Sequence, residues 1–206
     1  MEFLAGYHYR ALLAPSSLPP LVLLHGSGGT EKDLTGFGEA VRIDQPVYLV
    51  RGRIAWENGF AFFRRNADRS LDYDDLTMQT AELARFLKAL SERHAFNRPP
   101  VLIGYSNGAI IAASLIARHH ALTSGAVLLR PLSPFRDILP DTPKAYPLLI
   151  LAACHDQRRD PRDHEIIASQ FTSVGADVTH RLLDCDHEIS GEDVTETKSW
   201  LQGKLR

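Results

Sequence analysis

The feature that most constrains the fold is the pentapeptide Gly104-Tyr105-Ser106-Asn107-Gly108, which stands between two apolar runs. Val101–Ile103 precede it and Ala109–Ala113 follow it. G-x-S-x-G between a strand and a helix is typical of a nucleophile elbow, a tight turn that lifts a serine hydroxyl clear of the sheet. Side chains two residues before and after the serine would collide in such a turn, so both positions require glycine. The sequence therefore predicts a strand, a sharp turn and a helix, with Ser106 as nucleophile.

Strand-like and helix-like segments alternate along the rest of the chain. Strands are predicted over Tyr7–Ala14, Leu21–His25, Pro46–Val50, Gly125–Leu129, Leu148–Ala153 and Val178–Leu183. Helices are predicted over Thr30–Val41 with Thr30 as N-cap, from Asp72 to before Arg98, and over Ala109–Ala117, His164–Val174 and Glu192–Leu201. This alternation predicts an α/β fold, one domain over residues 1–206 with a mostly parallel sheet and helices on both faces. Residues 51–71 are irregular, and no extended lid is expected.

Composition excludes several functional classes. A formal net charge of −2 gives no reason to expect nucleic acid or an anionic membrane as a partner. No apolar run approaches the roughly 18 residues of a membrane span, and residues 1–6 lack the basic and apolar regions of a signal peptide. We therefore expect a cytoplasmic protein whose partner is a small molecule. Its oligomeric state is open, with a homodimer as one option.

A serine nucleophile needs a base and an acid, and both are available in the required chain order. In sheets of this kind the candidate groups gather at the carboxyl ends of the strands, in the order Ser, Asp or Glu, His. Asp156 follows the strand predicted over Leu148–Ala153, and His187 follows the strand over Val178–Leu183. We predict His187 as base and Asp156 as the acid that orients it. Asp160 is the alternative acid, but it lies farther from its strand.

A glycine-rich loop after an early strand predicts an oxyanion hole. The loop is His25-Gly26-Ser27-Gly28-Gly29. A tetrahedral acyl intermediate needs two preorganised N–H donors, and we predict the backbone N–H groups of Ser27 and Asn107 for this role. Phosphate binding is the alternative function of such a loop, but the Gly-x-x-x-x-Gly-Lys pattern is absent. His25 is expected to shape the turn.

Several segments together resemble a known family. They are 24–34, 51–53, 62–65, 104–109, 126–131 and 186–188. The chain is similar to the small bacterial carboxylesterases related to phospholipases and acyl-protein thioesterases. The resemblance implies a compact α/β-hydrolase fold with little or no lid, no metal or other cofactor, cleavage of carboxylic esters or thioesters, and Ser106, Asp156 and His187 as catalytic triad. Cys185 departs from the family, which often has glycine there.

Other residues have two interpretations. Arg53 and Arg130 follow predicted strands and are candidates to bind an anionic substrate, although pairing with Glu57, Asp68 or Asp72 is the favoured explanation for arginines here. Cys154 and Cys185 are expected to be small fillers, with a redox-sensitive pair as the alternative. A cluster from His155 to His164 resembles a metal site only superficially, and no metal is predicted.

The pattern as a whole predicts a serine hydrolase that cleaves esters or thioesters of small soluble substrates through an acyl-enzyme on Ser106. Two other functions remain open from the sequence. One is a catalytically silent ligand-binding module on the same fold, and the other is cleavage of amide or carbon–carbon bonds. An intact order of serine, acid and histidine favours the esterase, because a binding module would not need all three.

Overall fold

The computed structural model describes residues 1–135, 139–160 and 162–204, in which strands and helices alternate. The strands are β1 (Glu2–Leu4), β2 (Tyr7–Leu12), β3 (Leu21–Leu24), β4 (Val47–Arg51), β5 (Ile54–Trp56), β6 (Gly59–Ala61), β7 (Val101–Tyr105), β8 (Gly125–Leu129), β9 (Pro147–Ala153) and β10 (Asp177–Leu183). The helices are α1 (Thr35–Val41), α2 (Tyr73–Arg93), α3 (Asn107–His119), the 3₁₀ turn η1 (His120–Leu122), α4 (Asp163–Ser173) and α5 (Gly191–Lys204).

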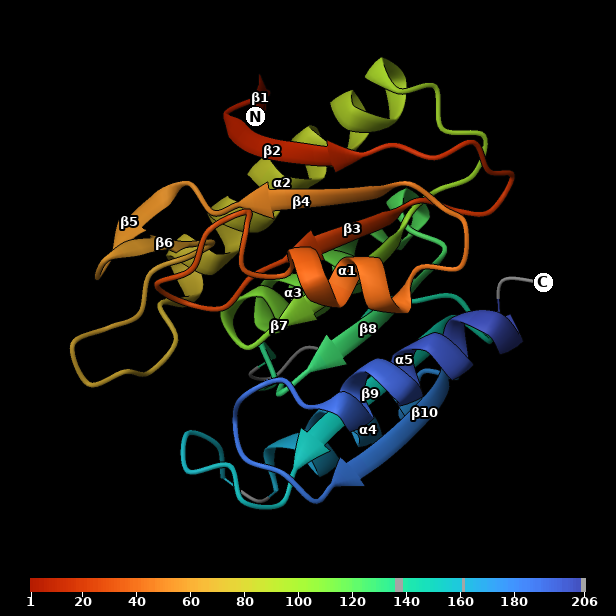
Figure 1. Cartoon of the computed structure of the whole chain (residues 1–206). Helices are drawn as coiled ribbons and strands as arrows, with labels where there is room; N and C mark the ends of the chain where they lie inside the picture. Colours follow the sequence, from red (N-terminus) through yellow and green to blue (C-terminus); the bar gives the residue numbers. More distant parts are fainter. Residues whose placement is uncertain (136–138, 161, 205–206) are drawn as a thin grey trace.

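Eight of these strands form a single twisted sheet in the order β1-β2-β4-β3-β7-β8-β9-β10 (Figure 1). β2 is antiparallel to both β1 and β4, and every pairing from β4 to β10 is parallel. Parallel neighbours need a crossover connection, and the helices between the strands provide most of these connections. The predicted α/β fold with a mostly parallel sheet is confirmed.

Helices cover both faces of the sheet because the central strands are apolar at every position. In β3, Val22 and Leu24 pack into the cluster that includes α2, α3 and α4, whereas Leu21 and Leu23 pack into the cluster that includes α1 and α5. α3 lies under the middle of the sheet, and its residues from Asn107 to Ala117 are all buried. A helix that is apolar all round is stable only in such a buried position, and its N-terminal end is thereby fixed against the sheet.

The first predicted helix begins too early. The prediction began at Thr30 with that residue as N-cap, whereas α1 begins at Thr35. The hydroxyl of Thr30 donates to the Asp33 carboxylate at 2.8 Å, and the N–H of Asp33 donates to the carbonyl of Thr30 at 3.3 Å. Thr30 therefore closes a local turn instead of a helix, a role that threonine and aspartate side chains often take. The next helix was predicted to open at Asp72, and Asp72 is the N-cap of α2, with its carboxylate accepting the N–H of Asp75 at 3.0 Å.

The segment predicted as an irregular loop holds the short hairpin β5–β6. Phe60 in β6 exchanges backbone hydrogen bonds with the glycine loop, with Gly28 N–H donating to its carbonyl and its own N–H donating to Gly29, both at 2.9 Å. β1 and this hairpin were missed because three-residue strands are too short to show a period. The hairpin braces the loop that follows β3, at the edge of the sheet where the candidate residues gather.

None of the helices in the described residues is long and apolar enough to traverse a lipid bilayer.

Candidate active site

Ser106 stands in a strained turn between β7 and α3. Its φ of 51° and ψ of −107° lie in a region that residues with a side chain rarely adopt. Its N–H donates to the carbonyl of Leu129 in the neighbouring strand β8 at 2.9 Å, and its carbonyl accepts the N–H groups of Ala109 and Ile110 at 3.1 Å. The strained residue is therefore held on both sides, by the sheet and by the first turn of the helix.

Two glycines allow the strand and the helix to approach closely enough for this turn. A Cβ atom on Gly104 would lie 2.3 Å from the carbonyl oxygen of Gly108. A Cβ atom on Gly108 would lie 2.2 Å from the carbonyl oxygen of Leu24 in β3. Both distances are far inside van der Waals contact, and both obstacles are backbone atoms that cannot rotate away. The glycines of the pentapeptide are therefore a steric requirement of the crossing.

The structure brings Ser106, His187 and Asp156 into one hydrogen-bonded chain. His187 Nε2 is 3.0 Å from Ser106 Oγ, and His187 Nδ1 is 2.7 Å from Asp156 Oδ2. Asp156 comes from the loop after β9, and His187 from the loop after β10. The Asp156 side chain is only 3% exposed and its other oxygen accepts the N–H of Arg158 at 2.8 Å. Asp160, the alternative acid, instead accepts from Arg162.

The electrostatics of this chain favour a neutral histidine. Burial lowers the pKa of His187 below its ordinary value, against the opposing effect of the Asp156 carboxylate. With the carboxylate on Nδ1, the ring carries its proton there and leaves Nε2 as an acceptor for the serine hydroxyl. Tyr105 holds the backbone of His187, since its hydroxyl donates to the His187 carbonyl at 3.2 Å, and its ring centroid lies 5.5 Å from that of the imidazole. The imidazole is thus oriented and neutral, with Nε2 free to accept a proton, which is the state that a general base requires.

The glycine loop after β3 lies beside the nucleophile. A Cβ atom on Gly26 would be 3.6 Å from Ser106 Cβ. In the described part of the chain, no backbone acceptor is assigned to the N–H of Ser27 or of Asn107. Both donors therefore remain available, and the oxyanion-hole role of these two residues stays a prediction. The Asn107 side chain holds the segment that follows β6, since its oxygen accepts the N–H of Phe62 at 2.8 Å.

His25 shapes the base of this loop. Its Nε2 accepts the N–H of Gly52 at 3.0 Å, which leaves the proton on Nδ1 to be donated to the Gly26 carbonyl at 2.6 Å. Burial lowers the pKa of His25, so the ring remains neutral and both hydrogen bonds persist. The ring ties the glycine loop to the start of the segment that carries the β5–β6 hairpin.

The two arginines predicted to bind substrate are engaged elsewhere. Arg130 is fully buried and forms two hydrogen bonds to the Asp193 carboxylate, at 2.7 and 2.8 Å. Its three remaining N–H groups donate to the carbonyls of Leu151, Asp186 and Glu188, at 3.4, 3.2 and 3.0 Å. Asp186 and Glu188 flank His187, so Arg130 positions the histidine loop and has no free donor for a substrate. Arg53 pairs with an acidic residue, as the alternative proposed, but its partner is Glu82 of α2 at 2.7 Å and not one of the acids suggested from the sequence.

A different arginine lies at the nucleophile. Arg159 Nη2 is 3.1 Å from Ser106 Oγ, and Nε donates to the carbonyl of Arg130 at 3.0 Å. Sequence reasoning missed this residue because it singled out arginines directly after strands, and Arg159 stands six residues beyond β9. The only signal was its position in the same loop as Asp156.

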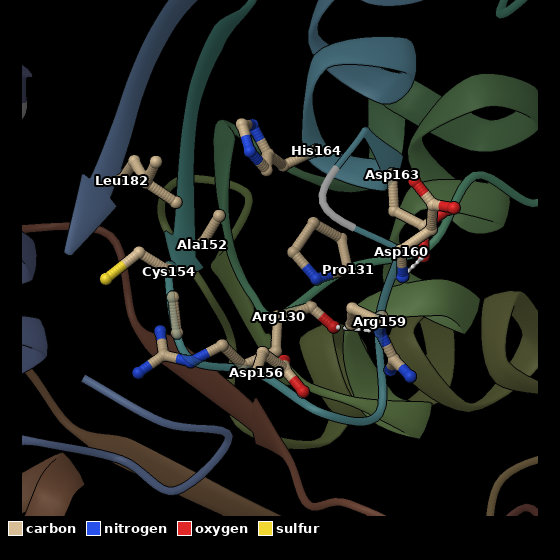
Figure 2. Close-up of a pocket in the computed structure, with 11 residues that line it drawn as sticks. Arg130, Pro131, Ala152, Cys154, Asp156, Arg159, Asp160, Asp163, His164 and Leu182 are labelled. Atoms are coloured by element: carbon tan, nitrogen blue, oxygen red, sulfur yellow. Dashed lines mark hydrogen bonds between the residues drawn. The ribbon is translucent and has the colours of Figure 1, made fainter. Parts of the chain in front are cut away.

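A pocket of about 480 Å³, counting space open to solvent, flanks this loop (Figure 2). Asp156, Arg159 and Asp163 line it, whereas Ser106 is not among its described lining residues. Both cysteines are free thiols. The cluster from His155 to His164 does not converge on one point, since Asp156 binds His187 instead. The group that does have metal-ligand spacing in the described residues is Cys154, His155 and Asp184, and all three are exposed.

No protein-family model matches the chain. A curated protein, "Putative hydrolase MhqD" of Bacillus subtilis (strain 168), is 36% identical over 183 residues, which is 87% of this chain and 90% of that protein. Two crystal structures are similar in both sequence and fold. The Bacillus cereus carboxylesterase has 32% identity and a TM-score of 0.91, covering 96% of this chain and 94% of its own. A carboxylesterase from Mesorhizobium loti has 31% identity and a TM-score of 0.89, covering 96% and 95%.

The steric argument for Gly108 leads to a stability prediction. Gly108→Ala places a methyl group against the Leu24 carbonyl, and we expect the free energy of unfolding in urea to fall by about 2 kcal/mol or more. Gly36→Ala in α1 is the matched control, because a Cβ there meets nothing within 4 Å; it should raise stability by about 0.5–1 kcal/mol. Equal stability of the two variants would contradict the crossing argument.

The Arg130–Asp193 pair leads to a second stability prediction. Arg130→Met leaves the Asp193 carboxylate buried without its cation, so we expect the free energy of unfolding to fall by about 3–5 kcal/mol. Arg53→Met is the control, since its partner Glu82 is partly exposed and the pair should contribute within about 1 kcal/mol. Urea denaturation followed by circular dichroism measures both, and a loss no larger for Arg130→Met than for Arg53→Met would refute the difference.

Proposed function

This chain belongs to the carboxylesterase group of the α/β-hydrolase family, and we propose that it cleaves esters of small soluble substrates through an acyl-enzyme on Ser106. The observation that carries the proposal is the continuous hydrogen-bonded chain from Ser106 Oγ through His187 to Asp156, built on a backbone turn that holds the serine clear of the sheet. Hydrolysis of carboxylic esters is the general activity of the group. Beyond this general activity, we propose the serine mechanism, a small soluble substrate and a cytoplasmic location. Cleavage of thioesters is the alternative to cleavage of esters.

The first half-reaction transfers the acyl group to the serine. Ser106 Oγ attacks the carbonyl carbon while His187 Nε2 takes its proton, over the 3.0 Å that separates the two atoms. The carboxylate of Asp156 stabilises the imidazolium that forms, at 2.7 Å from Nδ1. In the proposal the N–H groups of Ser27 and Asn107 donate to the oxyanion. His187 then returns the proton to the departing alcohol or thiol.

The second half-reaction releases the acid. Water takes the place of the leaving group and loses a proton to His187 as its oxygen attacks the acyl carbon. The same two N–H donors would hold the second oxyanion, and collapse of that intermediate returns the proton from His187 to Ser106 Oγ. The carboxylic acid then leaves, and the hydrogen-bonded chain is restored.

The serine mechanism is tested by hydrolysis of 4-nitrophenyl esters from acetate to decanoate. We expect Ser106→Ala to lower kcat/KM by about 10⁴-fold or more, because the nucleophile is gone. Ser173→Ala, at the exposed end of α4, is the matched control and should retain wild-type activity. A fluorophosphonate probe should label the wild type and the control but not Ser106→Ala. Undiminished hydrolysis by Ser106→Ala would show that another residue is the nucleophile.

The lowered pKa of His187 leads to a pH prediction. Only the neutral ring accepts the serine proton, so activity is lost as pH falls through the pKa of His187. Because burial lowers that pKa, the midpoint of the acid limb of kcat/KM should lie below 6.5, the ordinary value for histidine. The charge of Arg158 also lowers the pKa, so Arg158→Gln should move the midpoint upward. A wild-type midpoint above 6.5, or a downward shift in the variant, would contradict this account.

A further inference from the structure

Arg159 presents a guanidinium group to the nucleophile without a carboxylate partner. Its three nitrogen atoms donate to Ser106 Oγ at 3.1 Å, to the Arg130 carbonyl at 3.0 Å and to the Arg158 carbonyl at 3.1 Å. These are neutral acceptors. In the part of the chain that the structure describes, no ion pair is formed by this side chain, although it is half-buried. Among the described residues, two of its five N–H groups have no acceptor.

A second arginine shares this environment. Arg65 is also half-buried, and its guanidinium donates to a neutral group, the Arg69 carbonyl, at 2.7 Å. Burial and the positive charge of Arg159 lower the pKa of Arg65 to about 10. The two guanidinium groups therefore repel one another, and neither forms an ion pair among the described residues. Asp156 and Asp163 offset only part of this cost, because their charges raise the pKa of Arg159 but burial outweighs them and the pKa is lowered overall.

Such an arrangement is unfavourable unless an anion joins it. Burying a cation without a counter-charge costs free energy, and so does holding two like charges together. Elsewhere in this protein a buried arginine is paired, as Arg130 is with Asp193. Arg159 is also fixed by its hydrogen bond to the backbone of Arg130, whose left-handed φ of 53° directs that carbonyl (Figure 2). The guanidinium is therefore preorganised beside the reacting atom.

We propose that Arg159 binds a carboxylate on the acyl part of the substrate, so that the preferred substrates are half-esters of short dicarboxylic acids. This inference rests on the proposed esterase function and names its substrate class. The acyl part is the relevant one because it becomes bonded to Ser106 Oγ in the acyl-enzyme, and Arg159 is hydrogen-bonded to that same oxygen. Ser106 Oγ contacts both the Arg159 guanidinium and the carbonyl carbon that it attacks. A carboxylate bound by Arg159 must therefore lie only a few bonds from the scissile carbonyl.

The test compares monoethyl succinate with diethyl succinate, which differ in the charge at the far end of the acyl chain. We expect Arg159→Gln to lower kcat/KM for the half-ester about 10- to 100-fold relative to the diester, mainly through KM, because a charge-assisted bidentate contact is lost. Arg159→Lys should restore part of the preference, since it restores the charge without the planar fork. An equal loss on both esters would overturn the proposal.

Arg158→Gln and Arg53→Gln are the matched controls. Each removes one positive charge. Arg158 is adjacent to Arg159 in the same loop, and Arg53 is a residue that the sequence offered as a candidate for substrate binding. Both should keep the wild-type ratio of half-ester to diester activity within about threefold, because the effect of Arg158 on the pKa of His187 acts equally on both esters. A ratio that falls as far in Arg158→Gln as in Arg159→Gln would show a general field effect and refute a specific contact.

A binding measurement separates this inference from the proposed function. Succinate is titrated by calorimetry into Ser106→Ala, which has no nucleophile, and into Ser106→Ala combined with Arg159→Gln. We expect binding to the first protein and at least a tenfold weaker affinity for the second. Failure of the wild type to hydrolyse either ester would count against the esterase, and succinate binding would still decide the role of Arg159. Equal affinity in the two proteins, or no binding to either, would overturn it.

Discussion

The close crossing of β7, β3 and α3 is the constraint on which the rest of the site depends. Gly108 lies against the Leu24 carbonyl and Gly104 lies against Gly108, so the helix begins directly on the sheet. Ser106 can then occupy its strained backbone conformation only because the hydrogen bonds to β8 and to the first turn of α3 hold it there. The glycine loop after β3 lies beside it for the same reason. One steric condition therefore sets the nucleophile and its two predicted oxyanion donors in a common geometry.

Much of this arrangement follows from local sequence patterns. The sequence predicts the apolar strands and the start of α2 at Asp72. It also predicts that Asp156 and His187 lie near each other, because the carboxyl ends of parallel strands meet at one edge of the sheet. Short elements could not be predicted from such patterns. β1 and the β5–β6 hairpin have three residues per strand, and Thr30 has the composition of a helix cap but serves a turn. In these segments tertiary contacts outweigh a weak local preference.

The arginines show a different limit. Arg130 and Arg53 follow strands, as a substrate-binding residue would, and nothing near them in sequence shows otherwise. Their partners are distant, because Asp193 lies 63 residues after Arg130 and Glu82 lies 29 residues after Arg53. Arg159 instead belongs to a charged surface loop and meets Ser106 only through the fold. The sequence indicates that an arginine could serve the site. Only the structure shows which arginines bind a carboxylate of the protein and which one lies beside Ser106.

The order of the elements along the chain also determines when the site can form during synthesis. Ser106 and the glycine loop belong to β3 and β7, at the centre of the sheet, but His187 follows β10, the last strand at its edge. Its loop is held by Arg130 to Asp193, which lies in α5, the last helix. Parallel pairing over such sequence separations is slow to form. A nascent chain that has folded only through β9 would hold the strained serine without its base, so hydrolytic competence would require the segment from β10 to α5 to have folded as well.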